Sequence, residues 1–164
     1  VRALAYLGDE WQLVIAGDGP ERGAILAEAE AQGIEDRVHL PGFVADPASL
    51  AGLFDVFALS SLSEQFPISV VEAMAAGLPV AAPAVGDVAE MVAEPNREFI
   101  VAPGDERALR RALATLAEGS ALRKRIGEAN RARARKEYDE TAMIARYKAL
   151  YWGLMDRKVG PRSA

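Results

Sequence analysis

The sequence has 164 residues, of which 51% are hydrophobic and 26% charged, and its net charge at pH 7 is −5. With no cysteine and a single histidine, it excludes disulfide bonds, thiolate metal sites, cysteine nucleophiles and clusters of histidine ligands. Its start shows no basic and apolar leader, and the uncharged run 73–86 is too short and proline-broken to cross a bilayer. These features predict one soluble, cytoplasmic domain.

The charge is distributed unevenly along the chain. Residues 1–104 carry 16 acidic side chains, four arginines and no lysine, a net charge of −12, whereas residues 105–164 carry eight acidic and 15 basic side chains, a net charge of +7. In the basic stretch RKRIGEANRARARKEY, charges alternate with Ala, Asn and Glu at helical spacing, and no aromatic residue occurs before Tyr138. This pattern favours a solvated helix face over a nucleic-acid or anionic-membrane surface.

The first 104 residues alternate between apolar runs and helix-like stretches. The runs do not alternate with polar residues, which is typical of parallel strands that are covered on both faces. Five such units within about 90 residues predict an α/β fold with a doubly wound, Rossmann-like parallel sheet. The predicted strands lie in WQLVIAGDGP, RVHLPGFV, DVFALSS, PVAAPAVG and EFIVAP.

From Asp105 onward the pattern is helical only. Leucines recur at helical spacing in RALRRALATLAEG, a second helix is predicted over residues 120–136, and DETAMIARYKALYWGLMD predicts a third. The third helix carries one apolar stripe, formed by Met143, Ile144, Tyr147, Leu150, Tyr151 and Leu154. We expect one domain over residues 1–155 and a flexible tail over 156–164. The opening VRALAYLGDEW reads as the end of a helix, so we expect the domain to be truncated at its N-terminal edge.

The loop Gly17-Asp18-Gly19-Pro20 follows the first predicted strand and precedes a helix. Ligands of doubly wound sheets collect at the carboxyl ends of strands, and glycines allow the backbone to approach a phosphate closely. The same four residues also make a good turn, and the third glycine of the dinucleotide fingerprint is absent. Phosphate binding and a purely structural turn therefore both stay open.

The stretch EQFPISVVEAMAAGLPV places two carboxylates around the start of a predicted helix. Ser69 is the predicted N-cap, the helix runs from Val70 to a glycine stop at Gly77, and Ser69 and Glu72 fit a capping box. The capping box explains Glu72 in structural terms, but it leaves Glu64 unexplained. A diphosphate on the amides at the helix start would repel both carboxylates, unless their partners are hydroxyl groups. The local chemistry thus favours a nucleotide sugar, with Glu72 on the ribose and Glu64 on the transferred sugar.

Four segments occur in a family's order and spacing: LVIAGDGPERGAIL, DRVHLPGFV, DVFALSSLSEQFPISVVEAMAAGLPVAAPAVGDVAEMV and EFIVAPGDERALRRAL. Together they resemble the C-terminal domain of a retaining glycosyltransferase of the GT-B fold, in the large family-4-like group (glycosyl transferases group 1). The resemblance covers roughly residues 12–155. Its most specific element is the Glu-x7-Glu pattern of Glu64 and Glu72.

The resemblance implies a domain that binds a nucleotide-sugar donor, whose sugar the whole enzyme moves to an acceptor with retention. It implies no cofactor and no metal held by the protein. Glu72 is expected to hold the ribose hydroxyls, and Glu64, the candidate catalytic residue, to contact the donor sugar near the reacting carbon. The other expected donor contacts are Phe66, Pro67, Ile68, Ser69 and Val70 at the diphosphate and sugar, Gly42, Phe43 and Val44 at the base, and Gly17 and Gly19 in the phosphate-side loop.

Some residues depart from the family's pattern. Pro67 stands where a small residue is usual, and Gly86-Asp87 replaces a common Gly-Gly pair. The family's cations for the diphosphate lie upstream of this chain, which leaves Arg22 as the nearest candidate. The N-terminal acceptor domain and its catalytic histidine are also absent, and His39 is expected to be packed in its strand. We therefore expect the isolated chain to be inactive.

Two other functions stay open. A non-catalytic scaffold or oligomerisation module would keep the fold with a decayed site, marked by Pro67 and Asp87. One half of a nucleotide-sugar epimerase would share the fold, although the Glu-x7-Glu context fits it less well. As partners we expect the donor and the missing acceptor domain, but no nucleic acid. Membrane contact is expected only through the absent domain, and the apolar face of the last helix is expected to be exposed or to form a dimer.

Overall fold

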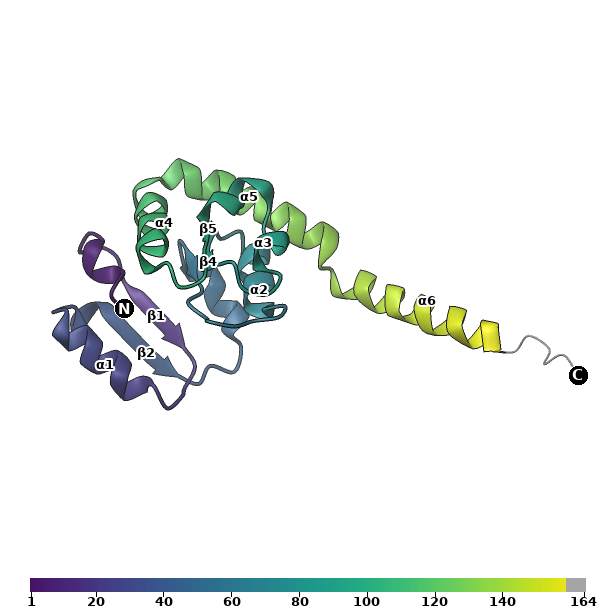
Figure 1. The fold of residues 1–164 in the computed structure, drawn as a ribbon, viewed down its shortest axis with the longest axis horizontal. Coiled ribbons are helices and arrows are strands. Elements are labelled where there is room, and N and C mark those ends of the chain that lie inside the picture. Colours follow the sequence, from purple (N-terminus) through teal and green to yellow (C-terminus); the bar gives the residue numbers. More distant parts are fainter. Residues whose placement is uncertain (159–164) are drawn as a thin grey trace, which may run out of the picture.

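The computed structural model describes residues 1–158, and Figure 1 shows how their strands and helices are arranged. The strands are β1 (Leu13–Ala16), β2 (Val38–Gly42), β3 (Phe57–Ala58), β4 (Val80–Pro83) and β5 (Ile100–Val101). The α-helices are α1 (Arg22–Ala31), α2 (Ile68–Ala76), α3 (Val88–Met91), α4 (Glu106–Glu118), α5 (Ser120–Glu137) and α6 (Glu140–Lys158). Short 3-10 helices lie at η1 (Leu4–Tyr6), η2 (Glu35–Arg37), η3 (Pro47–Leu53) and η4 (Glu94–Phe99).

The strands form two parallel sheets. β1 pairs with β2, and β4 lies between β3 and β5. Val80 of β4 stands opposite Phe57 of β3, and Ala82 stands opposite Ile100 of β5. The predicted α/β fold with parallel strands and a helical C-terminus is confirmed, although its five strands do not form one continuous hydrogen-bonded sheet.

The strand order is compatible with a doubly wound sheet. In the usual doubly wound order, 3-2-1-4-5-6, the first strand lies between strands 2 and 4. The observed pairs match that order if β1 and β2 are its strands 2 and 3, and if β3, β4 and β5 are its strands 4, 5 and 6. β1 and β3 are then the strands that the first strand would separate. A strand upstream of β1 stays a prediction.

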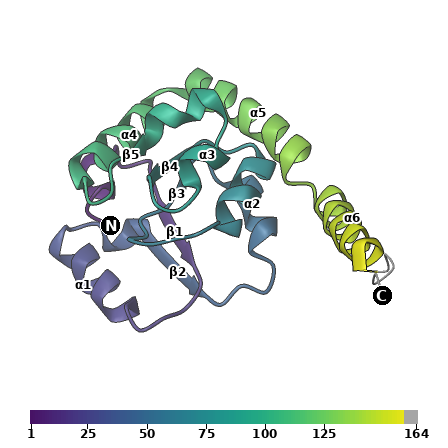
Figure 2. The same ribbon diagram turned by 45° about the vertical axis from the view of Figure 1, so that its right-hand side comes forward.

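Helices cover both faces of the three-stranded sheet. Neighbouring residues of a strand point to opposite faces, so each face contacts a different set of helices. All four residues of β4 are buried. Val80 and Ala82 belong to an apolar cluster with Met74 of α2 and Val88 of α3, whereas Ala81 belongs to a second cluster with α4 and α5. Figure 2 shows α2 and α4 on opposite sides of these strands. Since a fully buried Val or Met contributes about 1.5–3 kcal/mol, this packing fixes α2 firmly on the sheet.

Helix α5 fixes the C-terminal end of α2. Helix α2 stops, as predicted, at Gly77, which has the left-handed conformation (φ +83°). Arg131 of α5 donates hydrogen bonds to the carbonyl oxygens of Ala75 (3.2 Å) and Ala76 (2.9 Å), which satisfies carbonyls that the helix end leaves free. Gly127 of α5 approaches so closely that a Cβ atom there would lie 2.9 Å from the carbonyl carbon of Gly77. The position of α2 therefore depends on α5.

Two fully buried asparagines join β4, η4 and α5. Asn96 accepts from the Val80 amide (2.8 Å) and donates to the Val80 carbonyl (2.7 Å). Asn130 donates to Asn96 Oδ1 (2.7 Å) and to the Leu78 carbonyl (2.8 Å), and it accepts from the Ala93 amide (3.0 Å). Buried polar groups stabilise a fold only when they are hydrogen-bonded, as these are.

A buried arginine holds the N-terminal segment on the first sheet. Arg37 is 7% exposed and pairs with the exposed Asp9 at 3.5 Å. Its guanidinium donates to the carbonyl oxygens of Leu4 (3.1 Å), Leu7 (3.3 Å), Gly8 (2.9 Å) and Trp11 (3.0 Å). One planar side chain thus gathers four carbonyl groups of residues 4–11.

Replacing Arg37 is expected to destabilise the protein. Arg37→Ala leaves partly buried carbonyls without donors, so we expect a loss of about 2 kcal/mol in the free energy of unfolding, measured by urea denaturation. Arg37→Lys should retain little of that stability, because one ammonium group cannot reproduce the planar fork of the guanidinium. Arg97→Ala, at an exposed position, is the control, and equal effects of the two alanine variants would contradict the role of Arg37.

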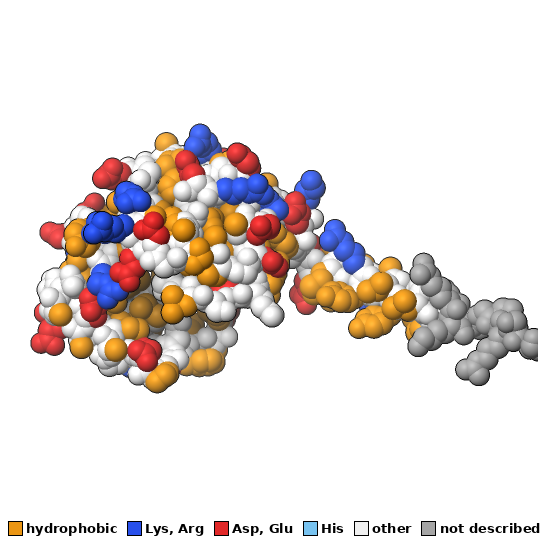
Figure 3. Space-filling view, in the orientation of Figure 1, with side chains coloured by type: hydrophobic (Ala, Val, Ile, Leu, Met, Phe, Trp, Pro, Cys, Tyr) orange, Lys and Arg blue, Asp and Glu red, His pale blue; other side chains and the backbone are white. Residues whose placement is uncertain are grey.

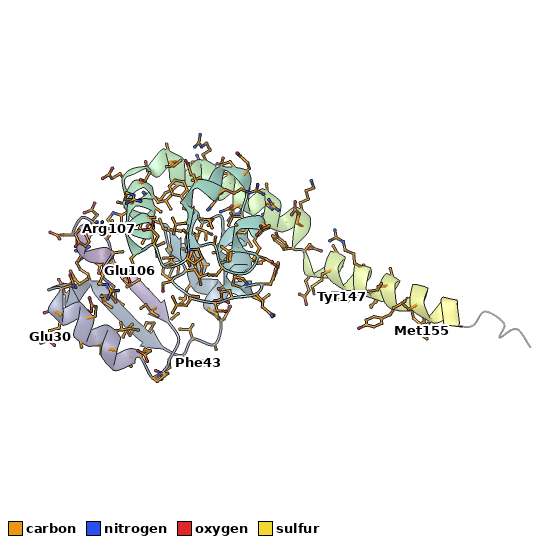
Figure 4. The ribbon with its side chains drawn as sticks, viewed as in Figure 1. Glu30, Phe43, Glu106, Arg107, Tyr147 and Met155 are labelled. Atoms are coloured by element: carbon orange, nitrogen blue, oxygen red, sulfur yellow. The ribbon has the colours of Figure 1, made fainter. Side chains whose placement is uncertain are left out.

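Helix α6 extends away from the rest of the protein (Figures 1 and 3). Tyr147, Tyr151 and Trp152 are 56%, 63% and 62% exposed, and Figure 4 shows Tyr147 and Met155 projecting from the helix. The expectation that this apolar face is exposed is confirmed, and a dimer through it stays a prediction. Helix α6 continues past the expected boundary at residue 155. The last part of the expected tail, 159–164, lies outside the described residues.

Candidate functional site

The first turn of α2 differs from the prediction. The helix begins at Ile68, and its N-cap is Pro67 in an extended conformation (φ −69°, ψ 110°). Ser69 therefore lies inside the helix, and within the described part of the chain no side chain caps this end. The predicted N-cap at Ser69 and its capping box with Glu72 are wrong. Proline, whose φ is fixed near the helical value, starts the helix two residues earlier than the serine would.

The start of α2 offers backbone donors. In the first turn of a helix, N–H groups have no intrahelical acceptor. The Val70 amide donates to the Pro67 carbonyl (3.0 Å), which leaves the amides of Ile68 and Ser69 as the donors at the helix end. Ile68 is 62% exposed, Ser69 is exposed, and the Val70 side chain is fully buried. At this helix start, Ile68 and Ser69 are therefore open to a ligand, whereas the Val70 side chain is not.

Glu72 lies one turn further along α2, outside the buried stripe. Ala73 and Met74 enter the core, whereas Glu72 is half-buried and shares a helix face with Ile68, four residues earlier. Helical side chains lean toward the N-terminus, so this carboxylate leans toward the free amides. None of the five ion pairs among residues 1–158 involves Glu72 or Glu64.

Residues 64–67, which we call the Glu64 segment, directly precede α2 in the connection that follows β3. Glu64 is half-buried and Pro67 is buried. The ring of Phe66, 41% exposed, meets the ring of Tyr138 edge to face, with 5.6 Å between centroids and 73° between planes. Such aromatic pairs contribute about 0.5–1.5 kcal/mol. The segment is thus anchored at its aromatic residue, directly before the start of α2.

The glycine loop after β1 uses its own amides within the protein. The Gly17 amide donates to the Gly42 carbonyl (2.8 Å), and the Gly19 amide donates to Asp18 Oδ1 (2.9 Å). Gly17 has φ +132°, which a residue with a side chain rarely adopts. Neither amide is free to bind a phosphate in this conformation. This supports the structural-turn interpretation of the loop, which can still shape a site.

A pocket of about 260 Å³ lies beside this loop. It is lined by Ile15, Ala16, Gly17, Asp18, Gly19, Pro20, Glu21, Arg22, Ile25 and Leu40. Arg22 is the one cation among these lining residues, is exposed, and donates through Nη1 to the Leu40 carbonyl (3.1 Å). The pocket therefore brings the expected phosphate-side loop and the candidate cation together.

The expected base-contacting residues follow β2. Gly42 has φ +78° and accepts the hydrogen bond from Gly17, so the two glycine positions are adjacent. Phe43 is 82% exposed and Val44 is half-buried. Figure 4 shows Phe43 in the loop that leaves the end of β2.

The predicted residues thus form two groups, both at carboxyl ends of strands. The first is the loop after β1 with Gly42, and the second is the Glu64 segment with the start of α2. No hydrogen bond or ion pair joins the groups within residues 1–158. His39 belongs to neither. It is exposed and bonds Gln12 through Nε2 (2.8 Å), so the expectation that it is packed is wrong, because its alternate position in β2 points to solvent.

Some residues that matter to the site carried little signal in the sequence. Tyr138 looked like the end of a basic helix, yet it supports Phe66, and its hydroxyl donates to the Met91 carbonyl (3.3 Å). In the sequence, Gly86 is distinctive only as part of a Gly-Asp pair. Its contact with the Glu64 segment depends on a loop fold that local sequence does not reveal.

The family model for glycosyl transferases group 1 matches residues 1–133. The chain is 27% identical over 144 residues to N-acetyl-alpha-D-glucosaminyl L-malate synthase of Bacillus anthracis, across 88% of this chain and 38% of that protein. It is 36% identical over 114 residues to 2-deoxystreptamine glucosyltransferase of Streptomyces kanamyceticus, across 68% of this chain and 29% of that protein. The chain spans less than half the length of these curated relatives.

A similar solved structure is that of the Anabaena protein HepE in complex with UDP. The TM-score is 0.85 at 26% sequence identity, and the match covers 93% of this chain and 43% of HepE. HepE has also been solved in complex with UDP-glucose.

Proposed function

Because the chain belongs to the group 1 glycosyl transferases, we propose that it binds the nucleotide-sugar donor of a retaining glycosyltransferase. In this proposal the whole protein moves a sugar from a nucleoside diphosphate to an acceptor, and the acceptor site lies in a domain outside this chain. The isolated chain would then bind the donor without turning it over. The UDP and UDP-glucose complexes of HepE support a nucleotide-sugar ligand.

The proposal rests mainly on the two carboxylates around the start of α2. Glu64 and Glu72 are both half-buried, and neither takes part in an ion pair among the described residues. Because Ser69 is not the N-cap, a capping box does not explain Glu72. Partly buried carboxylates need donors, and the hydroxyl groups of a nucleotide sugar supply them.

Each group of residues has a role in this proposal. The amides of Ile68 and Ser69 meet the diphosphate, because the positive end of a helix dipole favours an anion. Glu72 accepts hydrogen bonds from the ribose hydroxyls, and Glu64 accepts one from the donor sugar. The loop after β1 shapes the phosphate side, where Arg22 is the nearest cation. The main chain of residues 42–44 meets the base.

In the proposed reaction, the bond between the anomeric carbon and the diphosphate oxygen breaks, and its electron pair stays on the diphosphate. The start of α2 stabilises that charge as it develops, which is the usual form of electrostatic catalysis. The acceptor hydroxyl attacks from the same face and gives its proton to the departing phosphate oxygen. No protein nucleophile, cofactor or protein-held metal enters this scheme. Among residues 1–158 no cluster of three or more potential metal ligands occurs.

The first test is a ¹H–¹⁵N NMR titration of the chain with UDP, GDP and ADP. We expect one of them to shift the amide signals of residues 17–20, 42–44 and 64–72 together. Glu72→Ala should lower the affinity for that nucleotide at least tenfold, roughly the value of hydrogen bonds to one charged group, with an unchanged melting temperature. Glu90→Ala, at an exposed position on α3, should bind as the wild type does.

The titration also separates the alternatives. An unchanged affinity of Glu72→Ala would contradict the ribose role. No response to any nucleotide would favour the non-catalytic module, for which the exposed apolar face of α6 is the supporting observation. A cytoplasmic location, with membrane contact only through the acceptor domain, remains part of the proposal. Within residues 1–158, no helix combines the length and apolar character that crossing a bilayer requires.

A further inference from the structure

The loop between β4 and α3 touches the backbone of the Glu64 segment at two adjacent points. The amide of Asp87 donates a hydrogen bond to the Gln65 carbonyl (2.8 Å). Gly86 has φ +53° and lies against the same peptide groups, so that a Cβ atom on it would stand 2.6 Å from the Glu64 carbonyl oxygen and closer still to that of Gln65. Only glycine fits here, because both the conformation and the space exclude a side chain.

The Glu64 segment is also held through its aromatic side chain. Phe66 packs on Tyr138, whose hydroxyl bonds Met91 at the end of α3. The buried Pro67 then starts α2. The backbone contacts of Gly86 and Asp87 together with the aromatic pair thus leave the Glu64 peptide little freedom.

We propose that Gly86 is a positioning residue for Glu64, and that it sets the contribution of the sugar to donor affinity. Its missing Cβ lets the β4–α3 loop approach the Glu64 peptide, which places the half-buried carboxylate for a hydroxyl of the donor sugar. Gly86 acts through Glu64 and needs no contact with the ligand. This inference rests on the proposed function.

The side chain of Asp87 has no part in positioning Glu64. It is exposed and makes no capping hydrogen bond at the start of α3, where Asp87 is the N-cap. Asp87 contacts the Glu64 segment through the hydrogen bond of its backbone amide. Asp87→Ala should therefore leave binding unchanged, although the charge lies close to the segment.

The test compares affinities for a nucleoside diphosphate and for its sugar conjugates by isothermal titration of the 164-residue chain. The probes are UDP, UDP-glucose and UDP-N-acetylglucosamine, together with GDP, GDP-mannose, ADP and ADP-glucose. The measured quantity is the ratio of the dissociation constants without and with the sugar. We expect Glu64→Gln and Gly86→Ala each to lower this ratio about tenfold, and to change the affinity for the bare nucleotide less than about twofold.

The chain offers a matched control. Gly33 also has a positive φ (+66°), but a Cβ there would meet nothing within 4 Å. Gly33→Ala thus carries the backbone strain without the collision, and should leave the ratio unchanged. The double variant Gly86→Ala/Glu64→Gln should lose no more than either single variant, because both act on one contact.

The outcomes are distinct. A wild-type chain that binds none of the probes overturns the proposed function, and this inference with it. A ratio that falls in Glu64→Gln but not in Gly86→Ala overturns the positioning role alone. If Gly86→Ala does not fold, hydrogen exchange of the backbone amides of the wild-type chain tests the inference instead. The sugar conjugate should slow exchange of the Asp87 amide more than the bare nucleotide does, and equal rates would overturn the inference.

Discussion

Gly127→Ala is expected to lower the free energy of unfolding by about 3 kcal/mol or more. A methyl group at this position would collide with the backbone of Gly77, since its Cβ atom would stand 2.9 Å from the carbonyl carbon and closer to the oxygen. Backbone atoms cannot turn aside as a flexible side chain can. Helix α5 would have to move off the end of α2, and Arg131 would lose its hydrogen bonds to the last carbonyls of that helix.

The control for this variant is another helical glycine. Gly153 of α6 is exposed, and a Cβ atom there would meet nothing within 4 Å. In an exposed helix interior, alanine is favoured over glycine by about 1 kcal/mol, so Gly153→Ala should be neutral or stabilising. Urea denaturation followed by circular dichroism measures both variants. Similar effects of the two substitutions would mean that the contact between Gly127 and Gly77 is unimportant.

The regular elements were predictable because their signals are local. The apolar run of β4 is buried over its whole length, and the glycine stop of α2 lies where the sequence predicts it. The division of the strands into two sheets was not predictable, because pairing joins residues far apart in the chain. The network of Asn96 and Asn130 was not predictable either, since asparagine is mostly a surface residue and Asn130 lies in a basic helix.

The prediction of the site succeeded and failed for related reasons. The spacing of Glu64 and Glu72 correctly placed both around the start of α2. The cap was wrong because a serine three residues before a glutamate satisfies the capping-box pattern, while the buried Pro67 decides where the helix begins. Free amides in the glycine loop could not be judged from sequence, because their acceptors include the carbonyl of Gly42 on the neighbouring strand.

Asn130→Ala is expected to lower the free energy of unfolding by about 3–4 kcal/mol, because an unsatisfied buried polar group costs roughly 1–3 kcal/mol. The substitution leaves the Ala93 amide without its acceptor and the Leu78 carbonyl without its donor, both in buried bonds. It also leaves a cavity the size of an amide group. Gln32→Ala removes an exposed amide that bonds Glu28 at 3.1 Å at the C-terminal end of α1, and should change stability by less than about 0.5 kcal/mol.

A double-mutant cycle with Asn96→Ala tests whether the two asparagines act together. They share one hydrogen bond of 2.7 Å, so the double variant should lose less stability than the sum of the single losses, by roughly 0.5–3 kcal/mol. Additive losses would mean that each asparagine serves only its own backbone partners. The result bears on the site, because Leu78 follows the end of α2 and Val80 begins β4. Through these bonds α5 holds Leu78 and η4 holds Val80, so both ends of the connection between α2 and β4 are fixed. The position of α2 on the sheet, and with it that of Glu72, depends on this connection.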